Sequence, residues 1–556
     1  MLTQELCGLL VRAAERAVAA GDLPAAVPLP AFEVEPPRDP RHGDFAANLA
    51  LVLARAAGRP PRDVGTAILR HLPAPSEALA GAELAGPGFI NLRLAPALLH
   101  RWLRRVPEED LCFGHTDIGH GRRVLVEYVS ANPSGPLHVG SGRNGAVGET
   151  VARLLAALGY AVGREYYVND YGNQMEVLAR SVEARYFEAL GRPAEFPEDG
   201  YQGEYVVQIG RRLAAQHGAA LADVPEAERL ERIQQIALAA MLEDIRSTLE
   251  AFGIVFDTWF SERSLQETGA VQRVLDELAR QGLLYEQDGA LWFRATRFGD
   301  DKDRVMVRAD GRPTYFASDI PYHLDKYARG FEHLIDVWGV DHIGDIARMR
   351  GGLQALGKDP STLEVLLHQH VRLRNAGEVI RMSKRSGDYV TLRDLLDAVG
   401  RDAARFFFAM TSPPAPMDFD FALARRQSAD NPVYYVQYAH ARICSILREA
   451  ERAGVDVPAA EAVDLSPLTA PEEWALIKRT VMLPDVVYTA GTRREPQRLC
   501  AYARELAEAL HVFYTQCRVL SDDAALTAAR LMLVDAARRV LRNTLDFIGV
   551  TAVERM

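Results

Sequence analysis

The sequence predicts an α/β protein in which a domain built on a parallel sheet lies between an α+β N-terminal domain and an all-helical C-terminal domain. A strand–loop–helix–strand unit over 124–168 indicates the parallel sheet, and strand-like segments alternate with helical ones as far as about residue 400. From Pro432 onward the pattern is almost entirely helical. Because 556 residues exceed what one hydrophobic core organises, we expect several domains.

The N-terminal region begins with an amphipathic helix over residues 1–20. Its apolar positions recur at helical spacing: Leu6, Leu9, Leu10, Ala13, Ala14 and Val18. Residues 43–48 then open an Ala- and Leu-rich helix, and 86–94 form a turn that leads into a strand. We expect this domain to end near residue 110.

The unit that indicates a parallel sheet has four parts. Residues 124–129 are rich in β-formers, 130–137 form a loop, a helix begins at about Gly142, and 165–168 form the next strand. The apolar positions of the helix fit a 3.6-residue period, and a glycine stops it: Val147, Val151, Leu154, Leu155, Leu158, then Gly159. A β–loop–α–β unit of this kind opens a nucleotide-binding sheet.

Residues of about 185–300 look mainly helical, as an insertion would. Strand-like segments return at 292–293, 305–307 and 334–338. These patterns divide the chain into residues 1–110, 111–400 with the insertion at about 185–300, a connecting segment 401–424, and a helical domain 425–556.

Composition indicates a soluble protein of the cytoplasm. The chain is 48% hydrophobic and 25% charged, and no run approaches the ~18 consecutive apolar residues of a membrane span. The N-terminus carries Glu5 where a secretory signal would be basic. Five cysteines are widely scattered, so neither a disulfide framework nor a zinc site is expected: Cys7, Cys112, Cys444, Cys500 and Cys517.

The charge of the chain is unevenly distributed. The net charge is −11, but residues 425–556 carry 17 basic and 17 acidic side chains, so the acidic surplus lies entirely in 1–424. Phosphate contacts need Lys and Arg, and the C-terminal region therefore repels RNA least. Only five basic residues are lysines, which we interpret as a compositional bias of the genome.

Residues 138–141, His-Val-Gly-Ser, lie where the first strand hands over to the first helix. Nucleotides bind at this edge of a parallel sheet, since the helix N-terminus offers free backbone N–H groups. Gly140 would let a ligand approach the backbone, and His138 can donate to a phosphate oxygen. By themselves these four residues fit an ordinary turn equally well.

Residues 379–388, Val-Ile-Arg-Met-Ser-Lys-Arg-Ser-Gly-Asp, form a basic loop after a strand-like stretch. Such a loop can fold over a triphosphate, and Lys384 is a compact charge suited to a pyrophosphate whose negative charge grows during reaction. Taken alone, a basic loop is more often simply solvated.

Together the two segments resemble the H-x-G-H and K-M-S-K-S signatures of class I aminoacyl-tRNA synthetases. Further blocks are similar to the arginyl-tRNA synthetases of that class, in the order of that family: 127–140, 168–174, 299–305, 314–320 and 546–556. The resemblance spans nearly the whole chain. It implies a Rossmann-like catalytic domain, a tRNA-contacting N-terminal domain and an anticodon-binding C-terminal domain.

The resemblance also implies the reaction and its partners. ATP with Mg²⁺ would activate L-arginine as its adenylate, which would be transferred to tRNA(Arg) with release of AMP and pyrophosphate. We expect a monomer, no structural zinc and no membrane partner. Activation is expected to need tRNA, as in the family.

The signatures depart from the family pattern at two places. Ser141 stands where the family usually has a second histidine, and the second signature begins with Arg381 in place of lysine and has Arg385 at its end. A serine hydroxyl donates a hydrogen bond but adds no charge, so Arg143 could supplement the phosphate contacts. The catalytic residues implied are His138, Ser141 and Lys384, and the ATP-binding set is His138, Gly140, Ser141, Arg143, Met382, Ser383 and Lys384.

Recognition of arginine calls for a carboxylate, because a guanidinium is always ionised and presents five donors. The resemblance maps this role onto Asp319 and Tyr315, which share one face if the segment is helical. The alternative is that Asp319 caps a helix. The full arginine-binding set implied is Glu127, Ser130, Asn132, Tyr315, Asp319, Asp341 and His342.

The start of the C-terminal domain has aromatic residues interleaved with arginine, a composition that suits stacking on unpaired anticodon bases. The candidates are Tyr435, Tyr438 and Arg442, within a stretch that also holds Tyr434, Gln437 and His440. Each tyrosine, taken singly, fits a helical core equally well.

Three other functions remain open from the sequence. A small-molecule adenylyltransferase shares the nucleotide fold but would not need the helical C-terminal domain. A non-catalytic RNA-binding paralogue is disfavoured by His138, Lys384 and Asp319, although Ser141 would suit it. A class I enzyme for another amino acid is the third.

Overall fold

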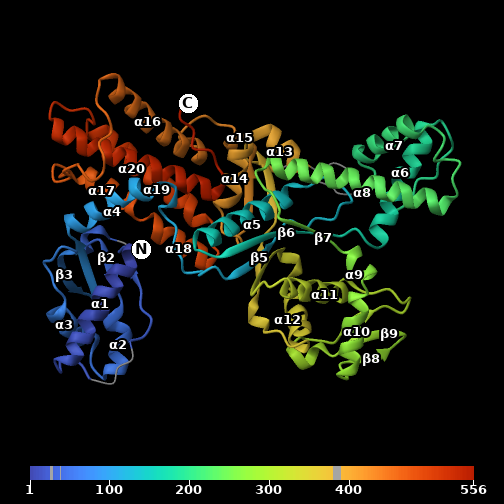
Figure 1. The fold of residues 1–556 in the computed structure, drawn as a ribbon, viewed down its shortest axis with the longest axis horizontal. Coiled ribbons are helices and arrows are strands. Elements are labelled where there is room, and N and C mark those ends of the chain that lie inside the picture. Colours follow the sequence, from blue (N-terminus) through green and yellow to red (C-terminus); the bar gives the residue numbers. More distant parts are fainter. Residues whose placement is uncertain (25–28, 38, 380–389) are drawn as a thin grey trace.

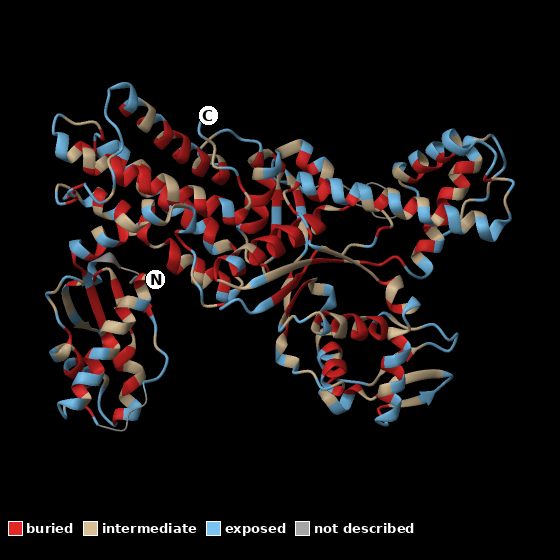
Figure 2. Ribbon diagram, in the orientation of Figure 1, coloured by how far each residue is buried: buried red, intermediate tan, exposed pale blue. Residues whose placement is uncertain are grey.

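The computed structural model describes residues 1–24, 29–37, 39–379 and 390–556. Figure 1 shows the N-terminal domain in blue at one end, a central sheet, two arms that extend from the sheet, and a helical C-terminal domain in orange and red. One hydrophobic core joins the N-terminal domain, the C-terminal helices and the central sheet, and Figure 2 shows buried residues in all three. No helix within the described ranges is long and apolar enough to cross a membrane.

The N-terminal domain packs helices on a four-stranded antiparallel sheet of order β1-β2-β4-β3. Its elements are α1 (Leu2–Ala19), β1 (Val34–Glu35), β2 (Phe45–Ala47), α2 (Leu49–Ala57), α3 (Pro61–His71), β3 (Leu79–Ala85), β4 (Phe89–Leu94) and α4 (Pro96–Glu109). The predicted first helix and the strand near 86–94 are confirmed. Residues 45–47, predicted to open a helix, instead form β2, because Phe45 and Ala47 pair with β4 and are buried.

The N-terminus of α1 is held by the C-terminal domain. The Asp485 carboxylate of α18 (Leu483–Arg493) accepts hydrogen bonds from the backbone N–H groups of Leu2 (3.0 Å) and Thr3 (3.1 Å). An acidic side chain at a helix N-terminus satisfies free N–H groups and complements the helix dipole. This contact fixes the N-terminal domain against the helices of the C-terminal domain.

The central sheet has five parallel strands in the order β12-β11-β5-β6-β7. They are β5 (Arg123–Glu127), β6 (Ala161–Val168), β7 (Thr258–Ser261), β11 (His333–Gly339) and β12 (Leu363–His368). Helix α5 (Val139–Ala157) connects β5 to β6, so the predicted β–loop–α–β unit is confirmed. Gly148 allows α5 to pack closely, because a Cβ there would lie 2.4 Å from the Tyr128 ring.

Two groups of elements extend from this sheet. Helices α6 (Asn173–Ala189), α7 (Glu204–His217) and α8 (Glu226–Ala251) share a separate hydrophobic core. The second group contains a small antiparallel sheet of order β10-β9-β8. Its elements are α9 (Arg263–Glu267), α10 (Ala270–Arg280), β8 (Leu284–Gln287), β9 (Ala290–Phe293), β10 (Arg304–Val307), α11 (Tyr315–Ala328) and α12 (Asp345–Ala355).

The prediction of one helical insertion over about 185–300 is wrong in part. Within that range β7 pairs with β6 as the edge strand of the parallel sheet, and β8 and β9 form a hairpin. Strand β7 has four half-buried residues and so lacks an alternating pattern that the sequence could reveal. The segments 292–293 and 305–307, expected to continue the main sheet, belong to the small sheet instead.

The C-terminal part is helical, as predicted. A three-stranded sheet of order β14-β13-β15 precedes it. Its elements are β13 (Val371–Asn375), β14 (Glu378–Val379), α13 (Leu392–Val399), α14 (Arg401–Ala409), β15 (Met417–Asp420) and α15 (Phe421–Ala424). The helices are α16 (Pro432–Arg452), α17 (Pro471–Val481), α18, α19 (Gln497–Gln516) and α20 (Ala524–Ile548). Short 3-10 helices are η1 (Pro40–His42), η2 (Asp110–Cys112), η3 (Ala295–Phe298), η4 (Val340–His342) and η5 (Pro360–Thr362).

Candidate active site

The first signature forms the N-terminus of α5, at the carboxyl edge of the sheet. His138 is the N-cap residue, and its Nδ1 accepts a hydrogen bond from the backbone N–H of Ser141 (3.2 Å). A Cβ on Gly140 would lie 2.8 Å from the His138 ring. The glycine therefore makes room for the histidine itself, rather than only for a ligand.

This cap determines which His138 nitrogen can act on a ligand. Because Nδ1 accepts a hydrogen bond, a neutral His138 ring would carry its proton on Nε2. The neighbouring His368 is neutral, since burial lowers its pKa to about 4.

Arg143 does not fit the ATP contact expected for it. Its side chain is fully buried, and its guanidinium donates to the backbone carbonyls of Gln369 (2.7 Å), Ser412 (3.0 Å) and Ala415 (2.8 Å). These bonds tie α5 to the loops after β12 and α14. A guanidinium committed to three carbonyl groups supports the fold, so we do not assign it to ATP.

The second signature lies only partly within the described residues. Met382, Ser383 and Lys384, all expected to bind ATP, fall in 380–389 and are outside them. The chain that follows meets the first signature directly: Thr391 forms a bridge with His138, and the Leu392 N–H donates to the Leu137 carbonyl (2.7 Å). The flank of the second signature is thus adjacent to the first.

Asp319 lies in the first turns of α11, one turn after Tyr315. The N-cap of this helix is Thr314, whose hydroxyl accepts a hydrogen bond from the Ala317 N–H, so Asp319 is not the cap. Burial and the negative charges nearby, chiefly Glu127, raise the pKa of Asp319 to about 6, although His323 opposes this. Perturbed acids of this kind are common in binding sites.

Glu262 is a second acid beside Asp319, and the sequence did not reveal it. It follows β7 directly and is buried. Burial and the charge of Asp319 raise its pKa to about 7, although hydrogen bonds with Tyr167 and Ser318 act in the opposite direction. Neither Asp319 nor Glu262 makes an ion pair with any residue that the structure describes. Among the residues that the structure describes, these two acids therefore lie together without a partner cation.

Glu127 and Ser130 lie at the end of β5, beside the same pocket. The Ser130 hydroxyl donates to Glu127 Oε1 (2.9 Å), and Lys326 Nζ donates to Glu127 Oε2 (2.6 Å). The charge of Glu127 acts on both Asp319 and Tyr167. The structure thus brings together Glu127, Ser130 and Asp319, as the sequence led us to expect.

Four other expected residues are exposed around the rim. Asn132 follows β5, the Tyr315 ring is 55% exposed at the start of α11, and Asp341 and His342 form part of η4 after β11. Asp341 accepts from His370 (3.1 Å), and His342 contacts Asp345 (3.1 Å). Asn132 follows the carboxyl end of β5, Asp341 and His342 follow that of β11, and Tyr315 lies one turn before Asp319 on α11.

Comparison with known families covers nearly all of this chain. A model described as "tRNA synthetases class I (R), catalytic domain" matches residues 109–207 and 222–408. "Arginyl tRNA synthetase N terminal domain" matches 9–94, and "DALR anticodon binding domain" matches 436–556. The arginine–tRNA ligase of Moorella thermoacetica is 53% identical over 553 residues, which cover 100% of this chain and 99% of that relative. The chain belongs to the arginyl-tRNA synthetase family.

Other relatives of this family agree. The arginine–tRNA ligase of Heliobacterium modesticaldum is 50% identical over 95% of this chain and 94% of its own. A putative arginyl-tRNA synthetase structure from Campylobacter jejuni has a TM-score of 0.77 at 33% identity, covering 83% of this chain and 100% of that one. The Thermus thermophilus arginyl-tRNA synthetase shares the fold, with a TM-score of 0.76 at 24% identity over 100% of both chains.

The arginyl-tRNA synthetase family defines the activity of the chain. It is an arginine–tRNA ligase of class I, which activates arginine with ATP and esterifies it onto tRNA(Arg), releasing AMP and pyrophosphate. The expected class I Rossmann-like fold is likewise confirmed. This outcome decides against the small-molecule adenylyltransferase, the non-catalytic paralogue and another amino-acid specificity.

The arginyl-tRNA synthetase chain carries an aromatic and cationic patch on α16 and α19, which we call the α16–α19 patch. Arg442 lies over the rings of Tyr438 (4.7 Å) and Tyr514 (4.6 Å), and His511 lies 4.8 Å from the Tyr435 ring. Tyr438 is 38% exposed and Tyr514 44%, so these two are not core residues. His511 and Tyr514, which the sequence analysis did not select, come from the second helix.

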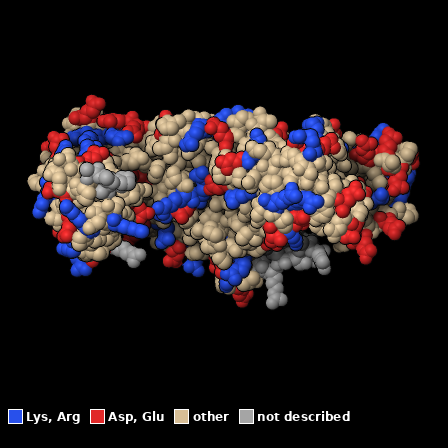
Figure 3. Space-filling view, turned by 90° about the horizontal axis from the view of Figure 1, so that it is seen from below, with Lys and Arg blue, Asp and Glu red and all other residues tan. Residues whose placement is uncertain are grey.

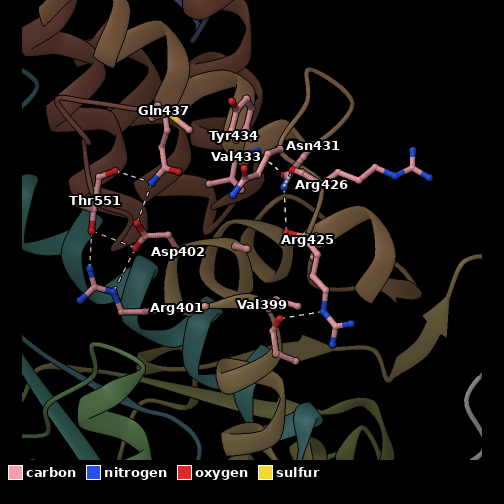
Figure 4. A pocket seen from close by; sticks show the side chains of 16 residues that line it. Val399, Arg401, Asp402, Arg425, Arg426, Asn431, Val433, Tyr434, Gln437 and Thr551 are labelled. Carbon is pink, nitrogen blue, oxygen red and sulfur yellow. Dashed lines mark hydrogen bonds and ion pairs between the residues drawn. The ribbon is translucent and has the colours of Figure 1, made fainter.

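A cavity of about 570 Å³ lies between α13, α14, α16 and the terminal segment (Figure 4). At its wall, Gln437 Nε2 donates to Asp402 Oδ2 (2.9 Å) and to the Thr551 carbonyl (2.9 Å), and Arg401 donates to the Thr551 hydroxyl (2.7 Å). His440 contacts the Val553 carbonyl (2.8 Å). Gln437 and His440 therefore hold the terminal segment against α14 and α16.

Proposed function

We propose that arginine binds at the carboxyl edge of β5, β6 and β11, with its guanidinium between Asp319 and Glu262. The observation that carries this assignment is that both acids lack an ion-pair partner among the described residues while their pKa values are raised to about 6 and about 7. A ligand cation that never deprotonates is the complement of such a pair. Glu127 and Ser130 are proposed to receive the α-amino end, with Asn132, Tyr315, Asp341 and His342 around the rim.

The ATP site is proposed at the N-terminus of α5, with His138 Nε2 donating to a phosphate. Gly140, Ser141, Met382 and Ser383 complete the proposed contacts, and Lys384 neutralises the leaving pyrophosphate. Mg²⁺ is proposed to accompany the triphosphate. Within the described ranges no group of three His, Cys, Asp or Glu side chains could hold a metal, which suits an ion that is bound mainly through substrate phosphates.

The tRNA is proposed to contact both terminal domains of the chain. Unpaired anticodon bases would stack on the α16–α19 patch, with Tyr435, Tyr438 and Arg442 as contacts within domain 425–556. Domain 1–110 would contact the tRNA elsewhere, with 111–400 as the catalytic domain and 401–424 as the connection. Figure 3 shows basic and acidic side chains interspersed over one face, so individual Lys and Arg contacts would have to supply the phosphate binding. We further propose a monomer in the cytoplasm.

Asp319→Asn tests the arginine site, with Asp325→Asn as the matched control. Asp325 lies on the same helix and is ion-paired with Arg329 (2.7 Å), outside the pocket. Removing one partner of a desolvated charge pair costs about 2–5 kcal/mol, or roughly 30- to 5,000-fold in arginine KM. ATP–pyrophosphate exchange with saturating tRNA should show this loss for Asp319→Asn alone, with the ATP KM unchanged. An arginine KM equal to that of the control would overturn the assignment.

A further inference from the structure

Three charged side chains lie beneath the proposed arginine pocket without reaching solvent. Lys326, His323 and Asp336 are 0%, 2% and 1% exposed. Lys326 Nζ donates to Glu127 Oε2 (2.6 Å) and to Asp336 Oδ1 (3.0 Å). His323 Nε2 lies 2.7 Å from Asp336 Oδ2, and its Nδ1 lies 2.7 Å from the Asp319 carbonyl oxygen. We call Lys326, His323 and Asp336 the buried relay.

The hydrogen bonds of the relay determine its charges. Both ring nitrogens of His323 face oxygen atoms, Nδ1 the Asp319 carbonyl and Nε2 the Asp336 carboxylate, so the ring links these two residues. Burial alone would raise the pKa of Asp336, but Lys326 and His323 hold it below its usual range. Lys326 therefore lies between the carboxylates of Asp336 and Glu127, and His323 contacts the first of these. Asp319 and Glu262 are left as the uncompensated acids of the pocket.

The relay is not explained by stability alone. A buried ion pair often stabilises a fold no more than apolar residues of the same volume, because the desolvation of both charges opposes their attraction. Apolar residues in place of the whole buried relay would meet a partly aromatic environment, since the Tyr322 ring lies 4.3 Å from Lys326 Nζ. The hydrogen bonds of these charged groups fix orientations instead. They hold the carboxylate of Glu127 at the end of β5 and the turn of α11 that carries Asp319.

We propose that Lys326 and His323, anchored on Asp336, are positioning residues for the substrate arginine. Lys326 Nζ donates to Glu127 Oε2 and holds that atom in place, so that the carboxylate has a fixed orientation toward the α-amino group. His323 binds the carbonyl of Asp319 and fixes the turn of α11 from which that carboxylate projects. Neither residue touches arginine. The inference rests on the proposed function, which places arginine between Glu127 and Asp319.

The test compares Glu127→Gln, Lys326→Met and the double variant in pyrophosphate exchange with saturating tRNA. Methionine matches the length of lysine without its charge, and the double variant leaves no unpaired charge at this point. Glu127→Gln and Lys326→Met should each raise the arginine KM at least tenfold, with kcat per active site and the ATP KM within about threefold. The arginine KM of the double variant should not exceed that of the more affected single variant, because the effects of residues that act as one unit are not additive.

These variants distinguish an error in the proposed arginine site from an error in the proposed role of Lys326. If Glu127→Gln leaves the arginine KM unchanged, the proposed arginine site is wrong. If Glu127→Gln raises the arginine KM but Lys326→Met or the double variant shows the wild-type value, the positioning role of Lys326 is wrong. A purely structural lysine would lower the fraction of active protein and leave the arginine KM of the folded part unaltered. Lys358→Met is the control, since Lys358 contacts only the Tyr327 ring among its described partners (5.0 Å).

A measurement on the unmodified chain covers the case in which Lys326→Met does not fold. The sequence contains five lysines, Lys302, Lys326, Lys358, Lys384 and Lys478, so protein labelled at lysine Nζ gives five ammonium signals at most. Saturating arginine without ATP should shift the Lys326 signal, through Glu127, and leave those of Lys358 and Lys478 in place. A Lys326 signal that does not move, while Glu127→Gln raises the arginine KM, would overturn the inference.

Discussion

Burial and the charge of the neighbouring Asp319 carboxylate together raise the pKa of Glu262 to about 7. The two acids come from different parts of the chain, one after β7 and one in the first turns of α11, and the fold brings them together without a described cation between them. In water such a pair would separate or ionise freely. In this pocket it stores repulsion that a bound guanidinium would relieve.

This relationship predicts that arginine affinity depends on pH. With raised pKa values of about 6 and about 7, Asp319 and Glu262 are largely protonated at pH 5.5 and ionised at pH 8. A permanent cation binds the ionised forms, so arginine affinity should rise between these values, with release of protons on binding. Calorimetry at pH 6.5 in two buffers of different ionisation enthalpy measures that release.

The control for this experiment is Glu262→Gln, which removes the group of higher pKa. Proton release should fall while weaker arginine binding remains. Equal release in both proteins would assign the protons to other groups. Those that face the pair are Tyr167 of β6, Asp170, Glu127 of β5, His323 and Lys326 of α11, and Asp336 of β11.

The N-cap geometry of His138 predicts unequal effects of its replacements. Asparagine can keep the Nδ1-like acceptor for the Ser141 N–H, whereas glutamine can place a donor near the position of Nε2. If Nε2 serves ATP, His138→Asn should lower the activation rate by about 10²–10³, the usual loss for one preorganised donor. His138→Gln should lower the activation rate about tenfold or less. Pyrophosphate exchange measures both, and the reverse order would mean that capping α5 is what matters.

Ser141 should matter less than His138, although it occupies the place of a second histidine. Its backbone N–H is bound to His138, and its hydroxyl offers only a neutral hydrogen bond, worth about 0.5–1.5 kcal/mol. Ser141→Ala should therefore lower the exchange rate roughly tenfold at most. A loss as large as that of His138→Asn would make the serine an equal partner.

Lys384 is expected to act in the transition state. Lys384→Ala should lower the activation rate by about 10²–10³ with a small change in the ATP KM, because the charge on the pyrophosphate grows as it leaves. Lys358→Ala serves as the control for loss of a lysine elsewhere. Steady-state exchange at varied ATP separates the two parameters. A variant that lost only ATP affinity would identify the lysine as a ground-state tether.

The α16–α19 patch is expected to bind anticodon bases through Tyr514. Stacking on an aromatic side chain contributes about 1–3 kcal/mol per base, so Tyr514→Ala should raise the tRNA KM roughly 5- to 150-fold. Val512→Ala is a matched control, since Val512 is 50% exposed on the same helix but two residues away, on another side of it. Aminoacylation at varied tRNA distinguishes them. Equal tRNA KM values for Tyr514→Ala and Val512→Ala would mean that the α16–α19 patch has only a structural role.

Parts of the fold were predictable because their patterns are local. The period of α1 and α5, the glycine stop after α5 and the helices beyond Pro432 depend on neighbouring residues only. Strand β7 was not predictable, because four half-buried residues after the long α8 carry no alternation. Residues 45–47 were assigned to a helix for a similar reason, since only pairing with β4 makes them a strand.

The site was predictable where a motif marks it. His138, Glu127 and Asp319 belong to blocks that resemble the family, whereas Glu262 lies in a segment that we assigned to an insertion. Lys326 and Asp336 show ordinary helix and strand patterns, and only the fold reveals that they are joined to Glu127. The missing charge at Ser141 predicts that Arg143 supplements the phosphate contacts, but burial commits its guanidinium to backbone carbonyls.

The most direct test of the arginine pocket compares arginine with citrulline, its neutral isostere, in the wild type and in Asp319→Asn. The wild type should prefer arginine by a large factor in competitive exchange, because two acids face the charged group. Asp319→Asn should reduce that preference at least 30-fold. The amide can donate a hydrogen bond to the ureido oxygen of citrulline, and it no longer forms an ion pair with the guanidinium of arginine. An arginine-to-citrulline preference that remains at the wild-type value in Asp319→Asn would contradict the central claim that these acids select arginine.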